Sequence, residues 1–184
     1  MFSELLQKLR QDKTNWEKFQ CNFIEKKIPS KTIILYEGEV STQLHFIKKG
    51  CLRLWFNKNG KDITLQFFFE NQAVSSLDSL ISHQPSLFAI ESIEPSTIIS
   101  IKKEDLEHLF QVYPEMKEDF QKILFQRFKN YTYLFLSRIR DTPQERYEDL
   151  VKNYPEIIKR VPQHYIASYL GITSVSLSRI RNRK

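Results

Sequence analysis

Apolar and polar positions follow two different rhythms along the chain, one before and one after residue 103. From residue 31 to residue 102, short runs rich in Ile, Leu, Phe and Trp are broken at Gly38, Gly50 and Gly60. Short apolar runs bounded by turn residues predict β-strands, and the regular spacing of the turns favours an antiparallel sandwich or roll. We therefore expect the first part of the chain to be an antiparallel β structure.

Two connections within this part can be predicted in more detail. Asn59-Gly60 lies between two apolar runs, and this dipeptide is a strong signal for a hairpin with a type I′ turn, which needs positive φ at both central residues. Pro95 separates residues 87–94 from residues 96–102, which we expect to form a last pair of strands.

After residue 103 the spacing of apolar residues becomes helical. Residues 104–113 predict a short amphipathic helix, and the segment from Pro114 to about Arg140 has no glycine and no further proline, which predicts one long helix. Its apolar residues cover more than the stripe that a surface helix buries. One covering surface could be the β structure and the other the same helix of a second subunit, while complete burial in a monomer is the alternative. The predicted dimer interface consists of Phe120, Ile123, Leu124, Phe128, Tyr131 and Phe135.

The next boundary is a helix start. The run Thr142-Pro143-Gln144-Glu145 has the residues of a capping box, with proline at the first helical position. We expect a new helix, and with it a new domain, to begin here and to end near Pro155.

The last segment predicts a helix, a short turn and a second helix. Pro162-Gln163 opens the first helix, Gly171 supplies the positive φ of the turn, and Thr173 caps the second helix. Ala167 is the small residue that two closely crossing helices need. The small core between them is expected to contain Ile166, Leu170, Ile172, Leu177 and Ile180. This combination is typical of a helix-turn-helix.

The positive charge of the chain is concentrated in the same segment. The chain has 28 Lys and Arg residues against 22 Asp and Glu residues, a net charge of +6. Residues 157–184 hold six basic residues and no acidic one, which leaves 22 basic against 22 acidic residues elsewhere. A basic helix-turn-helix predicts binding to duplex DNA, and a solvated basic tail is the alternative. The six are Lys159, Arg160, Arg179, Arg181, Arg183 and Lys184.

In such a unit the second helix lies in the major groove, with its N-terminal residues at the base edges. Arg179 could bind a guanine bidentately, and Val175 could contact a thymine methyl group. The predicted base-reading residues are Ser174, Val175, Ser176 and Arg179. The predicted phosphate contacts are Thr173, Arg181, Arg183 and Lys184. Ser174 and Ser176 could equally bind phosphate near the helix N-terminus.

The rest of the sequence argues against an enzyme. It has four glycines and no Walker, GxSxG or dinucleotide motif. Cys21 and Cys51 lie far apart without a CxxC group, which disfavours zinc and iron–sulfur sites. His45 and His83 stand alone, and a lone His is more often a core or surface residue than a haem or metal ligand. The charged start of the chain and the lack of a long apolar run predict neither export nor a membrane span, hence a cytoplasmic protein.

Across essentially its whole length the chain resembles the Crp/Fnr family of bacterial transcription regulators. EGEVSTQLHFIKKGCLRLW resembles the family's β-roll signature, the helix from Pro114 its dimerisation helix, and RVPQHYIASYLGITSVSLSRIR its helix-turn-helix. The resemblance implies an α+β protein with a cyclic-nucleotide-binding-like β roll in residues 1–113, a dimerisation helix in 114–140 and a DNA-binding domain in 141–184. It implies a homodimer that binds double-stranded DNA, with RNA polymerase as a further partner. Many relatives continue into a β wing after the second helix, so we expect this domain to lack a full wing.

The residues with which this family binds cyclic nucleotides are replaced here. Binding members carry a Gly-Glu-Leu stretch whose Glu holds the ribose, and an Arg-Ser pair whose Arg neutralises the phosphate. Ser75-Ser76-Leu77 and Ser86-Leu87 stand in those places. A buried phosphate without a charged partner is costly, so we expect an effector other than cyclic AMP in a pocket formed by these residues. The alternatives are regulation without a ligand, and a ligand-binding signalling module whose DNA-binding unit is degenerate.

Overall fold

The computed structural model describes residue 9 and residues 11–182, without the side chains of residues 14 and 15. Its described part forms two compact units. The first contains the chain up to Phe56 together with Gln66–Glu118. The second contains Asn57–Leu65 together with the chain from Asp119 onward.

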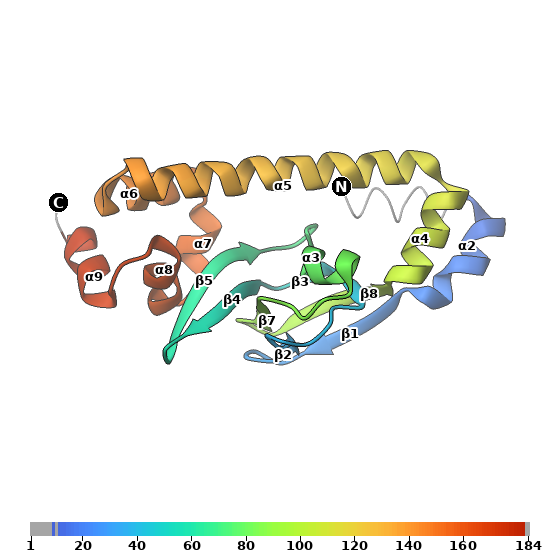
Figure 1. Cartoon of the computed structure of the whole chain (residues 1–184), viewed down its shortest axis with the longest axis horizontal. Helices are drawn as coiled ribbons and strands as arrows, with labels where there is room; N and C mark the ends of the chain where they lie inside the picture. The colour runs from blue at the N-terminus through green and yellow to red at the C-terminus, as the bar shows by residue number, and fades with distance from the viewer. Residues whose placement is uncertain (1–8, 10, 183–184) are drawn as a thin grey trace. The chain divides into compact units, whose positions relative to one another are not determined.

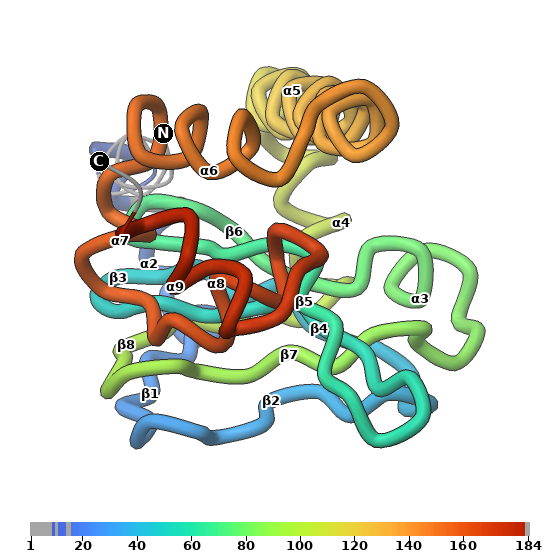
Figure 2. Tube along the Cα trace, turned by 90° about the vertical axis from the view of Figure 1, so that its left-hand side faces the viewer, coloured from blue at the N-terminus to red at the C-terminus, as the bar shows by residue number. Residues whose placement is uncertain are grey.

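The first unit is an antiparallel β roll with short helices, and the tip of one hairpin of the roll (Asn57–Leu65) is counted with the second unit (Figure 1). Its strands form two four-stranded sheets, with the orders β1-β8-β3-β6 and β2-β7-β4-β5. Figure 2 shows β8 beside β1 and β7 beside β2. The elements are α2 (Lys13–Phe19), the 3-10 helix η1 (Gln20–Asn22), β1 (Ile24–Ile28), β2 (Ile33–Leu35), β3 (Gln43–Lys49), β4 (Leu52–Lys58), β5 (Lys61–Phe68), β6 (Ala73–Val74), α3 (Leu77–Ser82), β7 (Ala89–Ser92), β8 (Ser96–Lys102) and α4 (Lys103–Val112).

The predicted β structure is confirmed in outline, and its clearest local signal is confirmed in detail. Asn59 and Gly60 connect β4 to β5 with φ angles of 54° and 79°, both positive as a type I′ turn requires. The prediction that the last two strands pair with each other was wrong. β7 pairs with β2 and β4, whereas β8 pairs with β1 and β3, because Ile93-Glu94-Pro95 carries the chain from one sheet to the other.

The core of the roll contains residues from both faces of its strands. In β3, the adjacent residues Phe46 and Ile47 are both buried, although successive side chains of a strand point to opposite faces. A strand buried on both faces has no alternating pattern, so its register cannot be read from the sequence. The most deeply buried apolar side chains include Leu44, Ile47, Leu52, Val74, Ile90, Ile101 and Leu109.

Helix α5 (Pro114–Arg140) has the bounds that the sequence predicts. It is followed by α6 (Pro143–Asn153), α7 (Pro155–Arg160), α8 (Gln163–Leu170) and α9 (Ser174–Asn182). The sequence analysis missed α7 and, in the roll, α3, because helices of six residues are too short to show a period. Among the described residues, no helix combines the length and the apolar character needed to cross a membrane.

The capping box at the start of α6 is confirmed. The Thr142 hydroxyl accepts a hydrogen bond from the backbone N–H of Glu145 at 3.3 Å. The Glu145 carboxylate accepts from the backbone N–H of Thr142 at 2.7 Å and from the Thr142 hydroxyl at 2.8 Å, and these two hydrogen bonds to the carboxylate lower the pKa of Glu145. Two N–H groups that lack helical partners are satisfied in this way.

Candidate nucleic-acid interface and effector site

Helices α8 and α9 are joined by a tight turn. Gly171 ends α8 with φ at 70°, in the left-handed region that glycine adopts without strain. Its N–H donates to the Ser168 carbonyl at 3.0 Å, and the N–H of Ile172 donates to the Ala167 carbonyl at 3.0 Å. These are the two backbone hydrogen bonds of a Schellman-type helix end. The buried residues of the two helices are Ile166, Ala167, Leu170 and Leu177.

Helix α9 begins with a capped N-terminus. The Thr173 hydroxyl accepts from the backbone N–H of Ser176 at 3.1 Å, which confirms the predicted cap. The hydroxyl groups of Thr173 and Ser176 lie 2.9 Å apart, within hydrogen-bond distance. Ser176 is half-buried, so this contact ties its side chain to the start of the helix.

The other predicted DNA contacts lie on the surface. Ser174, Val175 and Arg179 are exposed on α9, and Val175 is exposed to 61% despite its apolar side chain. Residues at positions i, i+1 and i+5 of a helix share one side, so these three can contact one groove. Arg181 is exposed as well. Arg183 and Lys184 lie outside the described residues.

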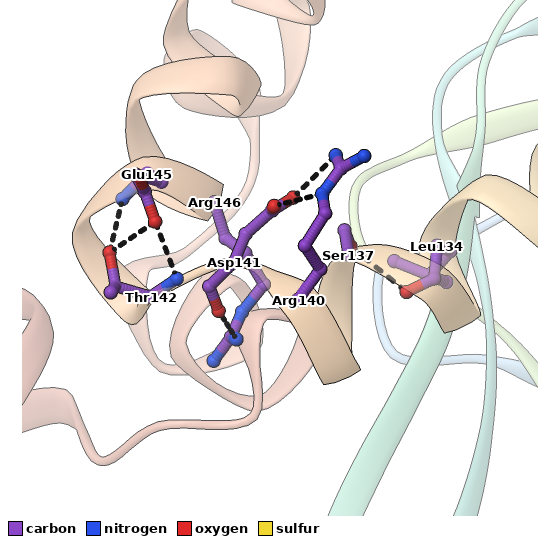
Figure 3. Close-up of polar contacts among 7 residues, drawn as sticks. All are labelled: Leu134, Ser137, Arg140, Asp141, Thr142, Glu145 and Arg146. Carbon is purple, nitrogen blue, oxygen red and sulfur yellow. Dashed lines mark hydrogen bonds and ion pairs between the residues drawn. The ribbon is translucent and has the colours of Figure 1, made fainter.

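The junction between α5 and α6 is a dense set of polar contacts (Figure 3). The N–H of Asp141 donates to the Ser137 carbonyl at 2.9 Å, which closes the last turn of α5. The Arg140 guanidinium bonds the Asp141 carboxylate at 2.6 Å and lowers its pKa. Arg146, from the first turns of α6, donates through Nη1 to the Asp141 carbonyl at 2.7 Å. The short connection is therefore fixed by side chains from both helices.

Helix α5 leaves many apolar side chains uncovered. Of the six predicted interface residues, Phe120, Ile123 and Leu124 are half-buried, whereas the other three are exposed. The most exposed apolar side chains of the helix are Phe125, at 72%, and Phe128 and Ile139, both at 69%. The exposed apolar stripe on α5 consists of Phe125, Phe128, Phe135, Leu136 and Ile139, whose spacings of three, four and eleven residues place them on one side of the helix. Phe125, Leu136 and Ile139 belong to the apolar residues that the sequence analysis expected to need a cover, but they were not among the six predicted interface residues.

In the β roll, three of the four predicted effector residues are buried and hydrogen-bonded. The Ser86 hydroxyl lies 2.8 Å from the Ser76 hydroxyl and 2.7 Å from the Phe88 carbonyl. The Ser75 hydroxyl lies 3.0 Å from the Ser41 hydroxyl and donates to the Gln43 carbonyl at 3.0 Å. Leu87 is 65% exposed and lies apart from these contacts.

Two further serines, which the sequence analysis missed, complete this hydroxyl cluster. Ser41 is buried, and its backbone N–H donates to the Ser79 hydroxyl at 2.9 Å. The Ser79 hydroxyl donates in turn to the Gln84 carbonyl at 2.6 Å. The hydroxyl cluster, defined as Ser41, Ser75, Ser76, Ser79 and Ser86, therefore ties the loop before β3 to α3 and to the loop after it.

The roll also contains a buried ion pair. Arg53 on β4 and Glu91 on β7 are register partners, and Nε and Nη2 of the arginine each lie 2.7 Å from the same carboxylate oxygen. The guanidinium carbon lies 4.5 Å from the centroid of the Trp55 ring. Arg53 is 2% exposed. Nothing in the local sequence marks this pair, because its members are 38 residues apart.

The two histidines considered as ligands have other partners. His45 is buried, with Nδ1 2.8 Å from the Ser100 hydroxyl. Burial, with a smaller contribution from Lys26, lowers the pKa of His45 to about 4, so the ring is neutral at pH 7. His83 is exposed, with Nε2 2.9 Å from the Lys103 ammonium nitrogen. Within the described ranges, His, Cys, Asp and Glu side chains form no group of three that could hold a metal ion.

Comparison with known proteins agrees with this architecture. Residues 25–113 match the cyclic nucleotide-binding domain family. A search of curated proteins finds no match to the chain. The part of the chain that matches the family contains the roll, the hydroxyl cluster and the ion pair.

Solved structures of Crp/Fnr-type regulators have a similar fold. FixK2 from Bradyrhizobium japonicum shares 17% identity over 88% of this chain and 83% of its own, with a TM-score of 0.73. A transcriptional regulator of the Crp/Fnr family from Eubacterium rectale shares 17% identity over 94% of this chain and 83% of its own, with a TM-score of 0.71. CLP, the c-di-GMP-responsive global regulator of Xanthomonas campestris, shares 17% identity over 89% of this chain and 87% of its own, with a TM-score of 0.70. At this identity the likeness shows the fold.

Proposed function

We propose that the chain is a homodimeric, sequence-specific DNA-binding transcription regulator of the Crp/Fnr type. The observation that carries the proposal is the α8–turn–α9 unit, whose second helix presents Ser174, Val175 and Arg179 to solvent on one side. A capped helix with exposed residues at its start and an exposed arginine, Arg179, in its last turn fits the major groove of duplex DNA. In this proposal, residues 1–113 form the sensor domain, 114–140 the dimerisation helix and 141–184 the DNA-binding domain.

The exposed apolar stripe on α5 supports the proposed dimer. Phenylalanines exposed to 72% and 69% are unusual on a surface that stays in water. A second copy of the same helix would cover the stripe and would bring two DNA-binding units together about a two-fold axis. The occupant we propose is therefore a second copy of this chain.

The hydroxyl cluster supports an effector other than cyclic AMP. Ser76 and Ser86 stand where the resemblance implies a ribose carboxylate and a phosphate guanidinium, and their hydroxyls bond each other at 2.8 Å. Neutral hydroxyls cannot replace a charge-assisted bidentate contact to a phosphate. We propose an unidentified small molecule as the effector.

Selection of bound fragments from sheared genomic DNA tests the function. Purified full-length protein is incubated with the fragments at moderate salt, with no addition, with cyclic AMP or with c-di-GMP. We expect enrichment of a two-fold symmetric site with half-sites about one helical turn apart, and no change with cyclic AMP. Enrichment only with cyclic AMP would overturn the effector argument. No enrichment in any arm would mean that DNA binding needs an effector other than these two nucleotides, or that the DNA-binding unit is degenerate.

Substitutions of two arginines of α9 distinguish contacts to the bases from contacts to the phosphates. Arg179→Ala is expected to lower affinity for the selected site by about 1–3 kcal/mol and to relax the sequence preference. Arg181→Ala is the matched control, and it is expected to weaken binding to selected and random duplexes alike. Fluorescence anisotropy with both duplexes measures the difference. Equal effects of the two substitutions on both duplexes would contradict these roles.

A further inference from the structure

The C-terminal end of α8 has an unusual set of hydrogen-bond partners. The last four carbonyl groups of a helix have no partner within it and need hydrogen-bond donors from elsewhere. Backbone N–H groups of the turn serve the Ala167 and Ser168 carbonyls. The Tyr169 carbonyl accepts from Arg138 Nη2 at 2.8 Å, and the Leu170 carbonyl accepts from Arg146 Nη2 at 3.1 Å. All four carbonyls are therefore satisfied, two of them by guanidinium groups.

The two guanidinium groups come from two other helices. Arg138 lies in the last turn of α5, and Arg146 lies at the start of α6. Arg146 also donates to the Asp141 carbonyl at 2.7 Å, so one side chain joins the end of α5 to the end of α8 (Figure 3 shows the Asp141 contact). Both contacts are made within the second unit.

The electrostatics favour this arrangement. Positive charge at a helix C-terminus is stabilised by the helix dipole, and hydrogen bonds from a charged donor are stronger than neutral ones. Partial burial lowers the pKa of Arg138, yet a guanidinium stays protonated at any physiological pH. Arg146 Nε is buried without a hydrogen-bond partner, and the hydrogen bonds of this side chain to the two carbonyls are made by Nη1 and Nη2.

We propose that Arg138 and Arg146 are positioning residues that fix the direction in which α9 faces DNA, an inference that rests on the proposed function. The two carbonyls they hold directly precede Gly171, and only residues 171–173 separate them from α9. Fixing these carbonyls therefore fixes the turn and the start of α9. Because Arg138 is part of α5, the two arginines also connect the start of α9 to the proposed dimerisation helix.

The test compares cognate with random duplex DNA, using the site selected by the full-length protein. Arg138→Ala and Arg146→Ala are each expected to weaken cognate binding about tenfold, the size expected for loss of a hydrogen bond to a charged group, with little change on random DNA. A purely structural role would lower both affinities together. Equal loss on the two duplexes, or no loss on either, overturns the proposal.

Lysine substitutions sharpen the test. Arg138 makes one contact to one carbonyl, which a lysine can replace, so Arg138→Lys should retain most of the cognate affinity. Arg146 holds two carbonyls through two nitrogens in a fixed fork, so Arg146→Lys should behave like Arg146→Ala. Rescue by both lysines would show that only charge matters and would contradict positioning.

A second measurement separates failure of this inference from failure of the proposed function. Amide hydrogen exchange of the free protein is compared between wild type and Arg146→Ala. Loss of the Arg146 contacts is expected to speed exchange at Gly171 and Ile172, whose N–H groups are bonded in the turn, and to leave exchange in the middle of α6 unchanged. If the wild-type protein binds no duplex, the proposed DNA-binding function is wrong. The exchange result still tests the positioning role of Arg146 independently. Unchanged exchange at both turn amides would contradict the proposed positioning role of Arg146.

Discussion

The β roll buries its apolar side chains, whereas helix α5 exposes many of its own. In the roll, Leu44 and Ile90 are fully buried, whereas on α5 Phe125 and Phe128 are 72% and 69% exposed. A buried core stabilises a chain at any concentration, but an exposed stripe contributes only when a partner covers it. We therefore expect the free energy of unfolding of the roll to be independent of protein concentration. Any dependence of stability on concentration should come from association through α5.

The largest expected effect is in the roll, at the buried ion pair. Glu91→Ala leaves the Arg53 guanidinium buried without its carboxylate, and breaking such a pair by removing one partner costs about 3–5 kcal/mol. Denaturant unfolding at two protein concentrations is the measurement. We expect the same loss of unfolding free energy at both concentrations.

A surface pair provides the matched control. Lys48 and Glu25 also lie in the roll, with the ammonium nitrogen 2.8 Å from the carboxylate, but both side chains are exposed. Glu25→Ala is expected to cost at most about 1 kcal/mol, because exposed ion pairs contribute little. A loss at Glu91 no larger than the loss at Glu25 would show that the buried pair is not a main support of the roll.

The next largest effect is a loss of stability at acidic pH, which also concerns the roll. The pKa of His45 is about 4 in the folded protein, below its ordinary value of 6.5, so the unfolded chain binds the proton more readily. The stabilisation is complete above pH 6.5 and is lost as the pH falls toward 4, by about 3 kcal/mol for a shift of this size. The measurement is the unfolding free energy between pH 7 and pH 4, compared with His45→Gln. Parallel curves for the two proteins would exclude this role for His45.

The smallest of the three effects concerns α5 and is expected to depend on concentration. Phe128→Asp places a charge in the exposed apolar stripe and is expected to weaken the proposed dimer by about 2 kcal/mol or more, the size of an interface hot spot. Analytical ultracentrifugation measures the equilibrium. Asn130→Asp is the control, because Asn130 is exposed on the same helix, outside the stripe. An unchanged equilibrium for Phe128→Asp would mean that the stripe is not the dimer contact.

Local signals in the sequence were sufficient for much of the fold. The Asn59-Gly60 turn, the bounds of α5 and the capping box at Thr142 each depend on residues that are neighbours in the chain. The pairing of β7 and β8 was wrong because adjacent strands in sequence need not be adjacent in a roll, and the choice of sheet depends on long-range packing.

The candidate sites could be predicted only in part for the same reason. Thr173 and Gly171 were found because a cap and a turn are local features. Arg138 and Arg146 were not found, because their carbonyl partners lie 31 and 24 residues away. Contacts between side chains and distant backbone groups leave no pattern in a single sequence. The roles of the α9 residues and of the effector residues stay predictions.

The hydroxyl cluster limits how this roll can change during evolution. Its hydroxyls bond one another or nearby backbone groups, so a carboxylate at Ser76 or a guanidinium at Ser86 would enter an assembled, uncharged network. Either change alone would bury a charge without its partner. An evolutionary path toward cyclic nucleotide recognition therefore passes through a less stable intermediate or acquires both changes together. We expect variants with only one of the two changes, at Ser76 or at Ser86, to be selected against whatever ligand they favour.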